Sequence, residues 1–175
     1  MNTLDAIRAR RSYRGRYLPT PVPREHLSAI MEAGLRAPSG CNKQTTSLIA
    51  VDDPEVLGQL HAVIDPPAGE TAPAMICVLT RPVIAYRDRT FFVQDYAAAI
   101  ENMLLTIADL GYESCWYEGH VTDVDRIGDK MARILGVPEE YQLVCFLPVG
   151  LAAENVKPPK KLPLESRCCF NRFSL

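Results

Sequence analysis

Basic residues gather near the start of the chain in a pattern that suits a phosphate group. Five of the 19 lysines and arginines lie in RARRSYRGR, residues 8–16. If this segment is extended, Arg10, Ser12 and Arg14 point to one side, because side chains alternate along an extended backbone. Two guanidinium groups beside a hydroxyl can bind a phosphate monoester through charge-assisted hydrogen bonds. A solvated basic turn is the competing interpretation, and spacing alone favours it.

A second candidate is the loop APSGCNKQTT, residues 37–46, which is rich in small polar residues. Ser39 and Asn42 can hydrogen-bond the polar edge of a ring, and Gly40 lets the backbone approach a flat ligand closely. An ordinary turn between a helix and a strand explains the same composition. The residue types alone favour that structural interpretation.

Cys41, in the middle of this loop, suggests a thiol enzyme as an alternative. A cysteine nucleophile needs a base, and none of the three histidines lies in a recognisable cysteine-hydrolase motif. The histidines are His26, His61 and His120.

Two more segments could complete a site. WYEGH, residues 116–120, follows a strand-like run, and strand ends are a common place for ligands. There Glu118 could act as an acid or base and the Gly119 amide could face a ligand. In PPKKLP, residues 158–163, Lys160 and Lys161 are held by prolines and could bind phosphate. An ordinary strand-to-helix turn explains WYEGH equally well, and for PPKKLP alone a solvated basic turn is the favoured interpretation.

Composition excludes several classes of protein. The net charge of -2 gives no general attraction to nucleic acid or membranes. No signal peptide or membrane-length apolar run is visible, so we expect a soluble, cytoplasmic protein. Scattered histidines and the lack of a C-x-x-C pair predict no metal site. Three of the six cysteines lie in apolar runs and should be buried thiols, not disulfides. These are Cys77, Cys115 and Cys145.

Hydrophobic periodicity predicts alternating helices and strands, typical of an α/β or α+β protein. Helices are expected over residues 3–10, with Thr3 as N-cap, and over 24–36, 54–64, 92–110 and 122–135. Strands are expected over 46–51, 74–80, 113–118 and 142–150. The helix at 92–110 is apolar over so much of its circumference that it should be buried, against the protein core or against another subunit.

The last 25 residues lack periodicity but carry many apolar side chains. We expect this segment, 151–175, to pack onto another surface, such as a partner chain. Its large apolar residues are Leu162, Leu164, Phe170, Phe173 and Leu175.

In this order and spacing, the segments resemble the FMN-dependent nitroreductase family over nearly the whole chain. The resemblance rests on IRARRSYRGRY, on APSGCNKQ and on DYAAAIENMLLTIADLGYESCWYEG, followed by VCFLPVG and the basic, proline-rich tail. It implies an α+β fold with a central mixed, mainly antiparallel sheet flanked by helices. It also implies one domain over residues 1–175 and an intertwined homodimer, with 151–175 packing on the partner subunit.

The resemblance also implies a set of cofactor-binding residues. Arg10, Ser12 and Arg14 would contact the FMN phosphate and ribityl chain, with Arg11 also in the cofactor-binding set, and Lys160 and Lys161 would complete the phosphate site. Pro38, Ser39, Gly40 and Asn42 would come from the other subunit and line the flavin ring. The turn at Glu118 and Gly119 would place a backbone amide near flavin N5. Cys41 would then be incidental.

The implied activity is that of an NAD(P)H-dependent flavin oxidoreductase. Hydride would pass from NAD(P)H to flavin N5, and a nitroaromatic, quinone or similar electron-poor acceptor would then take up the electrons in a ping-pong scheme. A non-catalytic FMN-binding or sensing protein is the main alternative. Gln44, Thr45 and Thr46 stand where the family often has Gln-Pro-Trp, and the chain has little room for the helical insert of longer members. Both differences affect the prediction of which acceptor binds more than the prediction of which cofactor binds.

Overall fold

A three-stranded antiparallel sheet lies at the centre of the structure, a computed structural model that describes residues 1–174. Its strands are β1 (Thr46–Val51), β2 (Ala74–Thr80) and β5 (Gln142–Val149), in the order β1-β2-β5. The bounds confirm three of the four predicted strands. Every residue of β2 is buried, as expected for a central strand that is covered on both faces.

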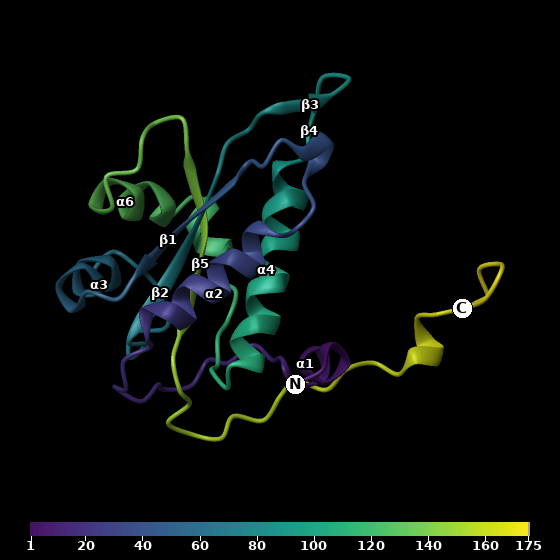
Figure 1. Ribbon diagram of the computed structural model, residues 1–175, viewed down its shortest axis with the longest axis horizontal. Helices are drawn as coiled ribbons and strands as arrows, with labels where there is room; N and C mark the ends of the chain where they lie inside the picture. The colour runs from purple at the N-terminus through teal and green to yellow at the C-terminus, as the bar shows by residue number, and fades with distance from the viewer. Residues whose placement is uncertain (175) are drawn as a thin grey trace.

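Helices cover both faces of this sheet (Figure 1). On one face lie α2 (Arg24–Leu35) and α4 (Phe92–Asp109), and on the other α3 (Pro54–His61) and α6 (Ile127–Ile134). The alternation of side chains along β2 divides the core accordingly. Ala74, Ile76 and Val78 pack with α2 and α4, whereas Met75, Cys77 and Leu79 pack with α3 and α6. The architecture is the expected α+β fold.

The first helix, α1 (Thr3–Ala9), packs against α4 and begins one residue earlier than its predicted cap requires. Thr3 is already helical, and the N-cap is Asn2, whose side-chain oxygen accepts a hydrogen bond from the Asp5 amide at 3.0 Å. Leu35 and Val93 are exposed, so α2 and α4 leave apolar surface uncovered.

The predicted strand at 113–118 is wrong. This segment makes only isolated bridges, in which Glu113 pairs with Gly150 and Tyr117 with Phe146. Both bridges share one antiparallel register, and in that register Cys115 lies opposite Pro148. Pro148 has no N–H to donate, so the ladder of hydrogen bonds is interrupted there. The only parallel pairing of the described residues is the isolated bridge from Ser12 to Ser114 on the same segment, so the sheet itself is antiparallel.

The helix predicted from Thr122 begins instead at Ile127, as α6, and Thr122 ends a separate short helix, α5 (Gly119–Thr122). Arg126, just before α6, has a left-handed backbone with φ of 47°, which cannot continue a helix. The Asp125 carboxylate does not cap α6 but binds the His120 ring.

A hairpin of β3 (Ile84–Tyr86) and β4 (Arg89–Thr90) was not predicted from the sequence. Its turn residues, Arg87 and Asp88, both have positive φ, and the pair lacks the Asn-Gly or Asp-Gly signal that usually marks such a turn. The hairpin projects beyond the N-terminal end of α4 (Figure 1).

The C-terminal segment runs away from the body of the protomer, past α1 (Figure 1). Its one short element is η2 (Leu164–Ser166), a single 3₁₀ turn. Four of its predicted apolar residues are exposed, and the fifth, Leu175, lies outside the described residues. The exposed four are Leu162, Leu164, Phe170 and Phe173. Among residues 1–174, no helix has both the length and the hydropathy needed to cross a membrane.

Candidate functional site

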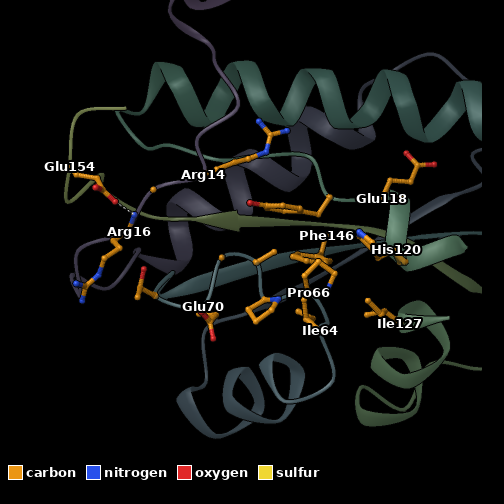
Figure 2. Close-up of a pocket in the computed structure, with 18 residues that line it drawn as sticks. Arg14, Arg16, Ile64, Pro66, Glu70, Glu118, His120, Ile127, Phe146 and Glu154 are labelled. Atoms are coloured by element: carbon orange, nitrogen blue, oxygen red, sulfur yellow. Dashed lines mark hydrogen bonds between the residues drawn. The ribbon is translucent and has the colours of Figure 1, made fainter. Parts of the chain in front are cut away.

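A cavity of about 440 Å³ lies beside β5, between the 64–71 loop and the turn that begins α5 (Figure 2). This volume is typical of small-molecule sites. The cavity brings together three residues that the sequence predicted for one site, Arg14, Glu118 and Gly119. A side chain added at Gly119 would meet nothing within 4 Å, so the backbone there is open to a ligand.

The wall of the cavity is apolar in the middle and charged at one end. Phe146 and Tyr117 stack with ring centroids 5.1 Å apart and planes 17° from parallel. Burial raises the pKa of Tyr117 to about 12, so the ring stays neutral. At the charged end, the Arg16 amide donates to the Glu154 carboxylate at 2.7 Å, as Figure 2 shows. The apolar middle suits a flat ring, and the charged residues of the wall include Arg14 and Arg16 together with the carboxylates of Glu70 and Glu154.

The Glu118 carboxylate is held by two donors. Tyr96 in α4 donates its hydroxyl to Oε1 at 2.6 Å, and the Trp116 indole donates to Oε2 at 2.8 Å. Figure 2 shows the Glu118 carboxyl directed away from Phe146, toward α4. Burial, together with the hydrogen bond to Glu118, raises the pKa of Tyr96 above its ordinary value. Because both oxygens accept hydrogen bonds, this carboxylate fixes the turn and is poorly placed to act as an acid or base.

The basic segment divides between the cavity and the protein interior. Arg11 is committed to Glu113, with Nε 2.8 Å and Nη2 2.6 Å from Oε1, and its Nη1 donates to the Val156 carbonyl. The hydrogen bond with Glu113 also raises the pKa of Arg11. Arg10 lies at the end of α1, with its Nε 3.5 Å from Oε1 of Glu101, and it does not line the cavity.

Ser12 lies between these arginines and Arg14. It pairs with Ser114, and the Tyr13 amide donates to the Ser114 carbonyl at 2.8 Å. Tyr13 is fully buried, whereas Arg14 is exposed, which agrees with an extended segment that turns alternate side chains outward.

The Pro38–Asn42 loop lies apart from the cavity, next to the start of α4. Its Gly40 amide and the hydroxyl of Thr45 both donate to the buried Asp95 carboxylate, each at 2.7 Å. Within the loop, the Gln44 amide donates to the Ser39 hydroxyl at 3.0 Å. Pro38, Ser39, Gly40 and Asn42 do not line the cavity of their own protomer.

Lys160 and Lys161 are exposed in the extended C-terminal segment and do not line the cavity. Figure 1 shows this segment leaving the body, so no contact within the protomer draws them toward Arg14.

The structure gives the thiol hypothesis little support. Cys41 is exposed, and two of the three histidines bind other side chains: His26 contacts Tyr112 and His120 contacts Asp125. The third, His61, belongs to α3. The three cysteines predicted to be buried are buried, and burial raises the pKa of each thiol. All six cysteines are free thiols.

Sequence reasoning missed several residues around the site. The 64–71 loop, which contains Pro66 and Glu70, forms one cavity wall, and its DPPAG run could have marked it as a loop between α3 and β2. Asp95 and Tyr96 lie in a helix that the sequence marks only as apolar, because periodicity says nothing about hydrogen-bond partners. Over the described chain, no group of three or more His, Cys, Asp or Glu side chains is arranged to hold a metal ion.

The protein has an α+β fold with a cavity where the Glu118–Gly119 turn meets the basic segment at Arg14. The family model described as the nitroreductase family matches residues 7–65 and 59–151 of the chain. The chain therefore belongs to the nitroreductase family and is an oxidoreductase of that family.

Relatives support this assignment. A Methanothermobacter thermautotrophicus protein that carries the name NADH dehydrogenase/NAD(P)H nitroreductase is 30% identical over 158 residues, covering 89% of this chain and 80% of the relative. An FMN-dependent nitroreductase structure from Clostridium difficile R20291 has a TM-score of 0.81 at 25% identity, covering 97% of this chain and 99% of that one. A Bacteroides fragilis nitroreductase structure with bound FMN has a TM-score of 0.79 at 26% identity, covering 98% and 100%.

Proposed function

We propose that this protein is an FMN-dependent oxidoreductase that takes hydride from NAD(P)H and passes electrons to an electron-poor small molecule. The main supporting observation is the cavity, which joins Arg14 to the Glu118–Gly119 turn across an apolar wall. Two similar structures are named for FMN, and two similar proteins are named for NAD(P)H.

The residues present fit the ring of FMN. Phe146 and Pro66 offer apolar surface to a flat ring system, and the exposed backbone at Gly119 can donate a hydrogen bond near flavin N5. Arg14 supplies a permanent positive charge, which favours an electron-rich ring. When bound, FMN supplies the redox chemistry: its ring accepts hydride at N5 and returns electrons to the second substrate. The protein binds and orients the cofactor and the substrates and excludes water from the site.

The phosphate would be held by residues from two parts of the chain. Arg10 and Ser12 lie upstream of Arg14 on the same extended segment, and Lys160 with Lys161 would approach when the C-terminal segment is docked. Each charge-assisted hydrogen bond to a phosphate oxygen contributes roughly 1.5–3 kcal/mol. Arg11 would contribute to this site only if its ion pair with Glu113 were broken.

A homodimer would complete the site. In the proposed dimer, Pro38, Ser39, Gly40 and Asn42 of one subunit line the flavin bound to the other, which explains their distance from their own cavity. Residues 151–175 would then pack on the partner subunit and cover the apolar surface that Leu35 and Val93 leave exposed. The acceptor, for which we propose a nitroaromatic, quinone or similar compound, would enter the same cleft after the oxidised nucleotide leaves.

The first experiment is spectroscopic. Purified protein should be yellow, or become yellow with added FMN, and should release FMN on denaturation. A colourless protein that takes up no FMN would overturn the proposal. Anaerobic titration with NADH and with NADPH should then bleach the flavin, and a panel of nitroaromatic, quinone and enone acceptors should restore it. A yellow protein that neither nucleotide bleaches would instead be a non-catalytic flavin-binding or sensing protein.

A further inference from the structure

Two consecutive residues of α4 hold the two segments proposed to surround the flavin. Asp95 binds the loop that contains Ser39, Gly40 and Asn42, and Tyr96 binds the turn at Glu118. Both lie in the first two turns of the helix, and both are at most 4% exposed. Neither touches the cavity.

Asp95 closes the loop at both ends. Its Oδ1 accepts from the Gly40 amide and its Oδ2 from the Thr45 hydroxyl, both at 2.7 Å. A buried carboxylate is costly unless hydrogen bonds compensate its charge. The two donors, together with the N-terminal end of α4, provide that compensation. Thr45 therefore has a structural partner in Asp95.

The loop between these two donors is strained. Three non-glycine residues, Cys41, Asn42 and Gln44, have left-handed backbones with φ of 50°, 53° and 48°. Such backbones cost roughly 1–2 kcal/mol each, and they persist where the surroundings fix them. Gly40 also admits no side chain, because a Cβ there would lie 2.7 Å from Cβ of Phe91. One conformation of the loop is thus held against its intrinsic preferences.

Tyr96 holds the other segment. Its hydroxyl lies 2.6 Å from Oε1 of Glu118, and Trp116 holds the second oxygen at 2.8 Å. Together they fix the residue whose peptide leads into Gly119, where the backbone is open to a ligand.

We propose that Asp95 and Tyr96 are positioning residues of the flavin sites. This inference rests on the proposed function. In the proposed dimer, the Asp95-bound loop serves the partner's flavin and the Tyr96-bound turn serves the protomer's own. The start of one α4 helix therefore connects both sites of the dimer, with one residue assigned to each.

The test uses substitutions that remove single hydrogen bonds. Thr45→Val is nearly isosteric and removes the donor to Oδ2 of Asp95, whereas Thr45→Ser keeps it. Asp95→Asn replaces one acceptor by a donor, and Tyr96→Phe removes the donor to Glu118. Asn102→Ala is the control, since Asn102 donates from the same helix to the Ala33 carbonyl at 3.1 Å and lies away from both segments. The measurements are the FMN dissociation constant, the visible circular dichroism of bound flavin and the melting temperature.

Thr45→Val and Tyr96→Phe should each weaken FMN binding about tenfold, equivalent to about 1.4 kcal/mol, and change the flavin dichroism. Thr45→Ser should retain the wild-type values. Asn102→Ala should lower the melting temperature without changing the flavin spectrum. If Thr45→Val and Tyr96→Phe keep the FMN binding and dichroism of the wild type, the inference is overturned but the proposed function is not. If wild-type protein binds no FMN, the proposed function fails first and the inference fails with it. If Asp95→Asn does not fold, the comparison of Thr45→Val with Thr45→Ser still tests the inference.

Discussion

Arg11 and Arg14 belong to the same basic segment but have different surroundings. The side chain of Arg11 is 21% exposed and bound to Glu113 and to the Val156 carbonyl, whereas Arg14 is exposed and lines the cavity. A guanidinium that already has protein partners contributes to stability, and one without them is available to a ligand. The two residues therefore form a matched pair for mutation.

Arg14→Ala should weaken FMN binding by roughly 1.5–3 kcal/mol with little change in melting temperature, because it removes a charge-assisted contact to the ligand. Arg11→Ala should instead lower the free energy of unfolding by ~1–3 kcal/mol and weaken FMN binding less. Isothermal titration and thermal melts of both variants distinguish these effects. The reverse pattern would assign Arg11 to the flavin site and remove Arg14 from it.

Cys41→Ser should leave NAD(P)H oxidation with a good acceptor within about twofold of wild type, since no base activates the thiol. The measurement is steady-state turnover before and after thiol alkylation of the wild-type protein. Loss of turnover in the variant, matched by loss on alkylation, would restore the thiol-enzyme hypothesis.

At the residue scale, the sequence anticipated the members of the site better than their arrangement. Arg14, Glu118 and Gly119 do meet at one cavity, as their motifs indicated. The other predicted contacts are not assembled in one protomer. Asp95 was not predicted because a single carboxylate in an apolar helix gives no signal until its loop partners are known.

At the scale of elements, glycine has different roles in a loop and in a helix. A Cβ at Gly40 would lie 2.7 Å from Phe91, whereas a Cβ at Gly58 in α3 would meet nothing within 4 Å. Gly40→Ala should therefore destabilise the fold by ~1–3 kcal/mol, and Gly58→Ala should be neutral or stabilise it by ~0.5–1 kcal/mol. Chemical denaturation measures both. Equal stabilities would show that the Gly40 loop moves freely away from Phe91.

The α3 helix carries a pH-sensitive group. Burial holds the pKa of His61 below its ordinary value, an effect that Glu70 partly offsets, and neither ring nitrogen has a hydrogen-bond partner in the protein. The folded state thus favours the neutral ring, so stability is full above about pH 6.5 and is lost as the pH falls below it. From about pH 7.5 to 5.5, the melting temperature of His61→Gln should fall less than that of wild type. Equal decreases in the melting temperatures of the two proteins would contradict this prediction.

At the scale of the molecule, the C-terminal segment lacks a surface to pack on within one protomer. Phe170 and Phe173 are 94% and 84% exposed, and the residues beyond Val156 leave the body (Figure 1). Exposed apolar side chains of this size mark an interaction surface. In the proposed dimer that surface is buried against the partner.

Deleting residues 157–175 should leave the melting temperature of the isolated protomer nearly unchanged but weaken dimerisation and FMN binding together. Light scattering and FMN titration measure the two losses. A full-length Lys160→Ala, Lys161→Ala variant is the matched control, and it should lose FMN affinity while remaining a dimer. A truncated protein that stays dimeric, or a wild-type monomer with FMN bound, would contradict the shared-site proposal.

Periodicity left the α/β and α+β classes open, and the choice of α+β came from the resemblance to the family. By itself, the sequence determined three of the four predicted strands and the main helices, because apolar periodicity and proline or glycine signals act locally. It also identified the family through motifs spread along the chain. Only the tertiary structure decided that segment 113–118 fails as a strand, since that depends on which residue lies opposite Pro148. It likewise decided that adjacent α4 residues hold two distant segments. Such pairings depend on contacts between residues far apart in the sequence, which local patterns do not encode.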